Sequence, residues 1–487
     1  MISRDEILTV ADETGLTPNV VEKDYVLGWM LGAIGANSVL SPTWIFKGGT
    51  CLKKCYFETY RFSEDLDFTL RDATQLEREF LTTQFTAIAE WLYESAGIVV
   101  PADRLVFDIH DNPRGRKSCE GRVYYQSYFA GGKQDLPKIK LDVTADEAVV
   151  MPVTRQTVFY PYADAPAQGI HIHCYSYPEV FAEKVRALGE RGRPRDLYDV
   201  INLFRNDQLP DAAVVQDILS QKCAYKGIRI PVLEDMESYK DALQGNWQPM
   251  LAHQLPSLPA FEVYWGVLPE FFNWLEGRAV EEKVALAEVT GSGQVYRPAY
   301  GRLGLRTLSG NSLEIIRFAA GNRLCVNLDY TDNEGHRSTR VIEPYSLRRA
   351  QNGNILLYAV RAEDGQIRAY KTDQINDASI TNRTFIPRYR IELGPARGDI
   401  RSVAQTSGWL PGSLGILQST SRRTRVSRPI SRSRTSGFGS EATYIYRCPI
   451  CDKTFRRKTQ NSTLNPHKTK DGWPCSGSAG YLEDITY

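Results

Sequence analysis

The sequence lacks the features that define several large classes of protein. No stretch approaches the ~18 uninterrupted apolar residues that a membrane-spanning helix needs, which argues against a membrane protein. The first residues, MISRDEILTVADETG, carry acids where a signal peptide has its apolar core. The nine cysteines are scattered apart from one late Cys-x-x-Cys pair, so a disulfide scaffold is not expected. We expect a cytoplasmic protein with mostly free thiols.

Two common enzyme signatures are missing, and the net charge of the whole chain is close to zero. Neither a Walker-type phosphate loop nor a serine-hydrolase elbow is present. The net charge of +1 hides an asymmetry, because residues 419–470 hold thirteen Lys and Arg against two acids, giving +11 there and −10 elsewhere. Such a basic segment is typical of a contact surface for nucleic-acid phosphates. The alternative is a solvated, disordered linker.

A chain of 487 residues is too long for one ordinary core and predicts two to four domains. Residues 1–200 alternate helical and strand patterns, with strands expected near 104–110 and 122–130, and residues 201–292 are mainly helical. Within the latter, YWGVLPEFFNWLEG has aromatic and aliphatic residues at helical spacing, which predicts a buried face. Residues 293–398 contain short strands separated by Asn-Gly and Asp-Gly turns, typical of a small β-barrel or sandwich. Residues 399–443 form a Gly/Ser/Arg-rich linker, and residues 444–487 form a Cys/His module.

The stretch FKGGTCLKKCYFETYRFSEDLDFTL, residues 46–70, places a glycine turn ahead of two acids in an apolar run. Side chains alternate along a strand, so Asp65 and Asp67 share one face about 7 Å apart. Two carboxylates this close repel each other unless a cation neutralises them, and Mg²⁺ (or Mn²⁺) with substrate phosphates is the natural partner.

The glycine turn itself predicts a place for those phosphates. Its backbone N–H groups, at Gly48, Gly49 and Thr50, suit the triphosphate of an NTP. Lys47 and Lys53 could add positive charge. The two cysteines that follow the turn, Cys51 and Cys55, lie four apart on a predicted helix and are expected in the core.

A third carboxylate is expected from a neighbouring strand, and KIKLDVT supplies Asp142. An exposed strand acid is the alternative for this residue. Downstream, EVFAEKVRALGERGRPRDLYDVINLF contains a helix with Lys184, a Gly/Pro break and a second helix with Asp196 and Asp199 three apart. Lys184 offers a cation near a nucleotide phosphate. The alternative here is an ion-pair network that joins two helices.

Five blocks in order make residues 18–285 similar to the AbiEii/AbiGii family of nucleotidyltransferase toxins, a branch of the DNA polymerase β-like superfamily. The blocks are EKDYVLGWML, FKGGTCLKK, RFSEDLDF, KLDV and EKVRALGERGRPRDLYD. The resemblance implies an α+β catalytic domain with a helical second half.

The same resemblance implies site residues and an activity. Asp65 and Asp67 take the place of the family's catalytic carboxylates, Asp142 that of the superfamily's third acid, and Lys184 and Asp199 that of its essential lysine and aspartate. Asp196 and Ser63 are expected beside the nucleotide. The implied reaction transfers a nucleoside monophosphate from an NTP to a hydroxyl, in characterised relatives at the tRNA 3′ end. It also implies a bacterial or phage-encoded toxin, with an antitoxin partner or a role in abortive phage defence.

The β segment resembles a WYL domain, with an SH3/Sm-like fold, through RVIEPYSLRR, NGNILLYAVRAEDGQIRAYKTDQI and the pair Thr384-Phe385. Ile355-Leu356-Leu357 stands where the domain's name-giving Trp-Tyr-Leu would be, a clear departure. Arg340 and Arg368 match arginines that line a ligand or nucleic-acid groove, as suits a bidentate phosphate donor. The alternative is a packing or dimerisation module.

The last segment has the ligand spacing of a zinc site. Cys448 and Cys451 are followed after fifteen residues by His467 and after seven more by Cys475. Three thiolates and one imidazole make a closed tetrahedral Zn²⁺ set, as in small C2HC-type fingers. Redox or coincidental cysteines are the alternative. The FRRK segment between the ligands would face nucleic acid.

Three functions compete at this point. The first is an NTP-dependent nucleotidyltransferase acting on RNA. The second is a nucleic-acid-binding regulator with a degenerate transferase domain, against which the intact acids argue. The third is a phosphotransferase that modifies a partner protein.

Overall fold

A computed structural model describes most of the chain. The described residues are 1–14, 16–57, 61, 63–112, 114–130, 136–206, 208–279, 283–290, 293–296, 309–393, 443–448, 451, 453–459, 461–469, 475 and 480–486. Among the helices in these ranges, none combines the length and apolar character needed to cross a membrane.

A seven-stranded mixed sheet forms the first half of the protein. Its strand order is β3-β4-β5-β2-β1-β7-β6. The central strand β2 runs antiparallel to β1 and parallel to β5. The strands are β1 Trp44–Lys47, β2 Asp65–Leu70, β3 Leu105–Asp111, β4 Lys117–Tyr124, β5 Lys138–Thr144, β6 Thr154–Thr157 and β7 His171–Cys174. The strand predicted at 122–130 therefore lies earlier in the chain, as β4.

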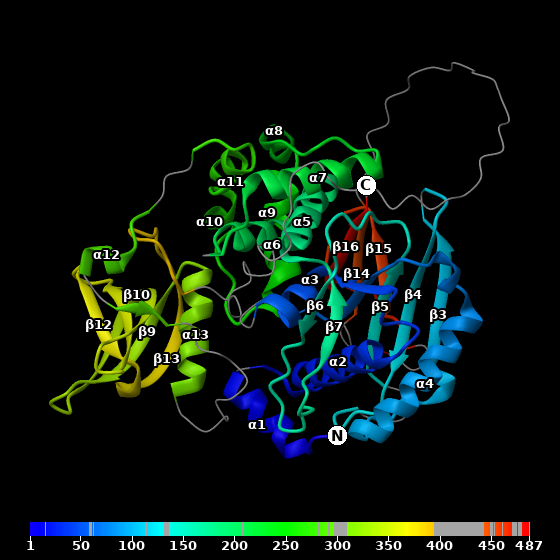
Figure 1. The fold of residues 1–487 in the computed structure, drawn as a ribbon, viewed down its shortest axis with the longest axis horizontal. Coiled ribbons are helices and arrows are strands. Elements are labelled where there is room, and N and C mark those ends of the chain that lie inside the picture. Colours follow the sequence, from blue (N-terminus) through cyan, green and yellow to red (C-terminus); the bar gives the residue numbers. More distant parts are fainter. Residues whose placement is uncertain are drawn as a thin grey trace.

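Helices cover one face of this sheet (Figure 1). Leu66 and Phe68 of β2 are fully buried, and Phe68 packs on Trp44, which also contacts Phe85 of α4. Because side chains alternate along a strand, Asp65 and Asp67 of β2 point to the opposite face of the sheet. The elements here are α1 Arg4–Thr14, α2 Pro18–Ala36, α4 Arg78–Ala96, α3 Gly48–Cys51, the π-helical turn η1 Leu52–Tyr56, and the 3₁₀ turns η2 Ala73–Gln75 and η3 Ala102–Arg104.

A helical region follows the sheet and carries the second group of predicted site residues. It comprises α5 Tyr177–Arg191, α6 Pro194–Phe204, α7 Ala212–Lys226, α8 Leu233–Glu237, α9 Lys240–Leu251, η4 Ala252–Gln254, α10 Phe261–Trp265, α11 Leu268–Leu275 and α12 Leu286–Thr290. Tyr264, Phe271, Phe272 and Leu275 are buried, which confirms the predicted buried face.

The second sheet lies at the other end of the molecule from the first (Figure 1). Its order is β12-β11-β10-β9-β13, with β8 paired to β10. A helix that the sequence did not predict, α13 Ser309–Gly321, packs on β9 and β13. The strands are β8 Gln294–Val295, β9 Leu324–Thr331, β10 Arg337–Arg349, β11 Ile355–Arg361, β12 Ile367–Lys371 and β13 Ile375–Thr384, with η5 Thr372–Gln374 between the last two.

A buried polar junction joins this β domain to the helical region. The side-chain oxygen of Asn322, just after α13, accepts hydrogen bonds from the hydroxyls of Tyr198 (2.8 Å) and Tyr264 (2.7 Å). Tyr198 lies in α6, directly before Asp199. The β domain is therefore hydrogen-bonded to the helix that carries two of the predicted site residues.

The C-terminal module is a small three-stranded sheet of order β15-β14-β16. Its strands are β14 Thr443–Arg447, β15 Thr454–Arg457 and β16 Tyr481–Thr486. The module packs on α9, where Met250 contacts a small core that includes Tyr446, Cys448 and Leu464.

Candidate active site

Three acids predicted from the sequence lie on the face of the first sheet opposite to Leu66 and Phe68. In the parallel pair β2–β5, Asp67 is the direct register partner of Asp142, and Asp65 lies one pleat further along β2. Neighbouring strands are ~4.8 Å apart, and residues two apart on one strand ~7 Å. The fold thus brings together three carboxylates from two strands that are about seventy residues apart in sequence.

The electrostatics of this group favour binding of a cation. The pKa of Asp67 is raised to about 7 by burial, and further by the charges of Asp142 and Asp65, while Lys47 and Lys184 oppose the rise. The pKa of Asp142 is also raised, first by burial. A divalent cation between the carboxylates would relieve this repulsion, and oxygen donors are the ligands that Mg²⁺ prefers. The donor type therefore suits the implied metal, but in this structure one oxygen from each of the three acids does not come within 4.8 Å of the other two.

The glycine turn leaves the space that these acids need. Gly48 has a φ of +80°, and a Cβ there would lie 2.1 Å from Oδ2 of Asp67. A Cβ on Gly49 would lie 2.6 Å from Nη2 of Arg61 and 3.2 Å from the hydroxyl of Ser63. The hydroxyl of Thr50 donates to the backbone carbonyl of Asp65 at 2.5 Å. This bond fixes the turn against β2, so the side chain of Thr50 has a structural contact besides its predicted role.

The two predicted lysines differ in their surroundings. Lys47 is the register partner of Asp67, and its ammonium lies 3.4 Å from Glu147. Lys53 is buried at 8% exposure on η1. Burial alone would raise the pKa of Asp24, but Lys54 and then Lys53 lower it. Lys47 thus lies beside the three acids, whereas the charge of Lys53 acts on a different carboxylate.

An ion-pair network connects α5 and α6. The ammonium of Lys184 lies 2.7 Å from Asp199 and 3.7 Å from Asp196. Arg61 donates two hydrogen bonds of 2.7 Å to Asp199, and Arg191 donates two to Asp196. Burial opposes ionisation of Asp199, but Arg61 and Lys184 hold its pKa well below the ordinary range.

Both interpretations of this segment therefore have support. The network joins the two helices, as the structural alternative predicts. The charge of Lys184 also lowers the pKa of Asp67, so this lysine acts on the acidic group as well as on Asp199. Sequence reasoning missed Arg61, whose only signal was its place four residues before Asp65 in the block RFSEDLDF.

The predicted groove arginines lie on the second sheet, Arg340 on β10 and Arg368 on β12. Arg368 is 42% exposed and lies 3.5 Å from Asp364. Burial raises the pKa of Tyr370, and the charges of Arg340 and Arg368 both oppose that rise.

The four predicted zinc ligands converge in the C-terminal module. One ligand atom from each of Cys448, Cys451, His467 and Cys475 lies within 4.8 Å of the others, and the Cys448 and Cys475 sulfurs are 3.7 Å apart. The Nδ1 of His467 is 2.9 Å from the carbonyl of Asn465, while its Nε2 is buried and has no hydrogen-bond partner among the described residues. An imidazole held through Nδ1 with an open Nε2 is what a metal ligand requires. The donor set fits a structural Zn²⁺. Of the basic segment 419–470, residues 419–442 lie outside the described part of the chain.

Cys51 and Cys55 are buried, as predicted for core residues. The fold adds Cys174 of β7, and the three sulfurs lie within 4.8 Å of one another. Sequence spacing could not show this contact, because Cys174 is more than one hundred residues away.

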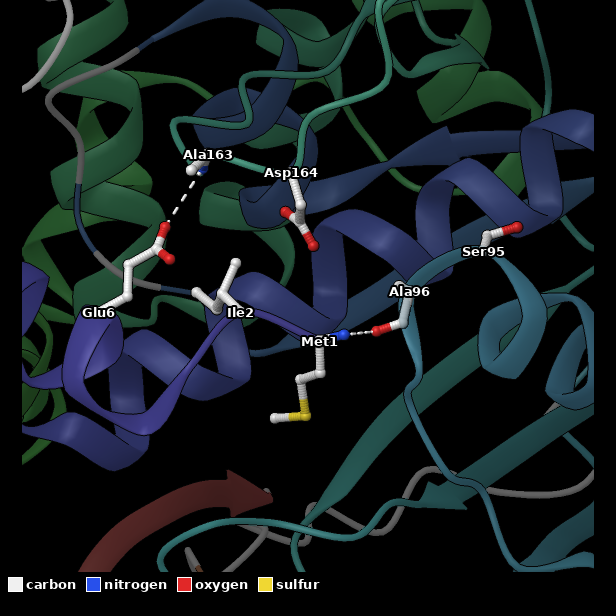
Figure 2. A pocket seen from close by; sticks show the side chains of 7 residues that line it. All are labelled: Met1, Ile2, Glu6, Ser95, Ala96, Ala163 and Asp164. Atoms are coloured by element: carbon white, nitrogen blue, oxygen red, sulfur yellow. Dashed lines mark hydrogen bonds between the residues drawn. The ribbon is translucent and has the colours of Figure 1, made fainter.

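Two hollows in the described part of the chain differ in the residues that line them. One of about 380 Å³ is formed by the start of the chain, the end of α4 and the loop of Asp164 (Figure 2). The ammonium of Met1 donates to the carbonyl of Ala96 there, and no predicted site residue lines it. A second hollow of about 220 Å³ is lined by Glu64, directly before Asp65, and by Lys23 and Tyr125. Neither of these two hollows is lined by Asp65, Asp67 or Asp142.

A mixed sheet that places three carboxylates on one face, beside a glycine turn, is the arrangement that the resemblance to nucleotidyltransferase toxins predicts. Residues 29–277, just over half of the chain, match the family model described as "Nucleotidyl transferase AbiEii toxin, Type IV TA system". The chain belongs to this family of nucleotidyltransferase toxins. Residues 311–380 match the model of the WYL domain, which confirms the second resemblance.

Two solved structures are similar to parts of the chain. MenT4, a nucleotidyltransferase toxin from Mycobacterium tuberculosis H37Rv, is 18% identical, with a TM-score of 0.39 over 57% of this chain and 91% of that chain. Proteasome accessory factor B/C of Arthrobacter aurescens is 11% identical, with a TM-score of 0.17 over 76% of this chain and 73% of that chain. Neither likeness is close enough to define a function. Comparison with curated proteins gives no match.

Proposed function

We propose that this protein transfers a nucleoside monophosphate from an NTP to a hydroxyl of RNA, at the 3′ end of tRNA, in a reaction that depends on Mg²⁺ or Mn²⁺. The observation that carries this proposal is the register of Asp67 against Asp142, with Gly48 leaving room for the Asp67 carboxylate. A carboxylate that is partly buried beside two others costs stability, and a metal–triphosphate complex at this place would offset that cost.

In this proposal Asp65, Asp67 and Asp142 hold the metal. When bound, the ion supplies positive charge to the phosphates and to the acceptor oxygen. The backbone of Gly48 and Gly49 binds phosphate oxygens through its N–H groups.

The lysines and the α6 acids complete the proposed nucleotide site. Lys184, held at 2.7 Å by Asp199, donates to a phosphate oxygen and neutralises charge that develops there. Asp196 orients Arg191 and Lys184. Lys47 stabilises the ionised form of Asp67, its register partner. Ser63, Thr50 and Lys53 are assigned to the nucleotide by the sequence pattern, and Lys53 has the least support because it is buried.

The other parts of the chain are proposed to recognise partners. The division at 1–200, 201–292, 293–398, 399–443 and 444–487 separates catalysis, a helical subdomain, a WYL-type sensor with a groove at Arg340 and Arg368, a basic linker and a zinc finger. The finger and the basic 419–470 segment would contact RNA through their Lys and Arg side chains. The protein would act in the cytoplasm as a toxin, in phage defence or with an antitoxin partner that restrains it.

The experiment that tests this function is incubation of the full chain with each α-labelled NTP, Mg²⁺, total RNA and cell protein. Label in RNA of tRNA size supports the proposal. Label in protein supports a protein-modifying phosphotransferase, and no label supports a nucleic-acid-binding regulator with an inactive transferase domain. Asp67→Ala should abolish labelling and leave RNA binding nearly unchanged, since the acid does not belong to the basic surfaces.

A further inference from the structure

One arginine of α6 has a buried side-chain nitrogen without a hydrogen-bond partner among the described residues. The Nε of Arg195 is buried and makes no hydrogen bond, and no carboxylate of the described residues pairs with this guanidinium. A buried donor without an acceptor costs about 1–3 kcal/mol, and such groups are rare in folded proteins. A ligand that accepts a hydrogen bond from Arg195 would explain why the protein tolerates this cost.

The surrounding charges make Arg195 a surplus cation. Asp199 is already shared by Arg61 and Lys184, and Asp196 already accepts two hydrogen bonds from Arg191. Burial lowers the pKa of Arg195, and the like charge of Arg61 lowers it further. Asp196 and Asp199 are therefore already paired with other cations.

The helix adds to this imbalance. Arg195 is the second residue of α6, an eleven-residue helix that begins at Pro194. The N-terminus of a helix carries partial positive charge and favours anions, so a cation in the first turn is unfavourable there. A bound anion would satisfy the guanidinium and the helix terminus together.

The location indicates which anion. Asp65 is among the charges that act on Arg195, and neighbouring Arg61 lies against Gly49 of the glycine turn. The charge of one proposed metal ligand, Asp65, therefore acts on Arg195, and so does that of Arg61, which lies against the proposed phosphate turn. The guanidinium fork matches phosphate oxygens in geometry and charge.

We propose that Arg195 forms a subsite for the β- and γ-phosphates of the NTP, and so for the pyrophosphate that leaves. This inference rests on the proposed function. In the transfer, the acceptor oxygen forms a bond to the α-phosphorus and loses its proton to solvent. The bond from the α-phosphorus to the bridging oxygen breaks, and pyrophosphate departs with the electron pair. Arg195 stabilises the negative charge that grows on this leaving group.

The test is binding of inorganic pyrophosphate with Mg²⁺ to the full chain, measured by calorimetry. Arg195→Ala should weaken binding by about ten- to a hundred-fold, the effect of losing a charge-assisted hydrogen bond, and Arg195→Lys should weaken it less. The matched control is Arg155→Ala, an exposed arginine on β6 of the same sheet, which should bind like the wild type. Unchanged binding by Arg195→Ala, or no binding by the wild type, would overturn the subsite.

A second measurement separates binding from a structural role. Without ligand, Arg195→Ala should unfold at the same temperature as the wild type or higher, because an unpaired cation is removed. A lower melting temperature would indicate that the residue only supports the fold. If the wild type binds pyrophosphate but transfers no label from any NTP, the subsite stands and the proposed function fails. If the wild type labels RNA and Arg195→Ala does so with an unchanged KM for NTP, the function stands and the subsite fails.

Discussion

Asp67→Asn should stabilise the metal-free protein while it abolishes the metal response. The substitution keeps the size of the side chain but removes one of three negative charges on adjacent strands. In the wild type the pKa of Asp67 rises from an ordinary 3.8 to about 7. Such a carboxylate binds its proton more tightly in the folded than in the unfolded state, so the folded state loses stability as pH rises between these two values.

The size of the effect follows from that difference. At about 1.4 kcal/mol for each pH unit, the full cost above pH 7 would be about 4 kcal/mol. Because the side chain is partly open to water, we expect about 2 kcal/mol, or a few degrees in melting temperature. Asn mimics the protonated acid and escapes this cost. The gain should therefore be present at about pH 8 and absent near pH 4.

The assay is thermal unfolding of the wild type and Asp67→Asn, with and without Mg²⁺, across this pH range. Mg²⁺ should raise the melting temperature of the wild type, more at high pH than at low pH, and leave the variant unchanged. A variant that is less stable than the wild type at about pH 8, and that responds equally to Mg²⁺, would refute the reasoning.

Three further predictions concern the turn, the domain junction and the finger. Gly48→Ala should destabilise by more than about 1 kcal/mol and abolish transfer, since the new Cβ would collide with Asp67 at a positive φ; equal activity in a transfer assay would contradict this. Asn322→Ala should cost about 2 kcal/mol in denaturant unfolding, because two buried tyrosine hydroxyls lose their acceptor, and a change within measurement error would exclude the junction. Cys475→Ala, or a strong chelator, should expose only the C-terminal module to limited proteolysis, because the metal supplies its folding energy; cleavage throughout the chain would count against an independent finger.

The sequence predicted the site acids because they lie in short, regular patterns. Period-two alternation places Asp65 and Asp67 on one face, and the strand of Asp142 is equally clear. The local pattern cannot predict that Asp67 lies opposite Asp142. This register depends on the parallel pairing of two strands about seventy residues apart. The expectation that Asp142 joins Asp65 and Asp67 from a neighbouring strand rested on the pattern of acids, and the family resemblance supported it.

Other elements were predicted at shifted positions or missed where local signals and tertiary packing disagree. The strand β4 contains Gly121, a weak strand former, yet a Cβ there would lie 2.9 Å from Leu141 of β5, so the close approach requires glycine. The helix α13 begins with Ser-Gly-Asn-Ser, which is typical of a turn. Burial of Ile316 and Phe318 against the second sheet outweighs that signal.

The residues that hold the site together were the hardest to predict. Arg61 lies in a loop and donates a hydrogen bond to Asp199. Gln254, in a short 3₁₀ turn, accepts a hydrogen bond from Arg61. No periodicity marks such contacts, because each side chain comes from a different element. Arg195 likewise gains its significance from the cations that surround it.

The central claim is that three carboxylates and the glycine turn form a metal-dependent NTP site. Its most direct test is transfer of α-labelled nucleotide to purified tRNA by the wild type and by Asp67→Asn, with RNA binding measured alongside. The account predicts Mg²⁺-dependent labelling by the wild type, none by the variant, and equal RNA binding by both. Labelling by Asp67→Asn at the rate of the wild type would contradict it.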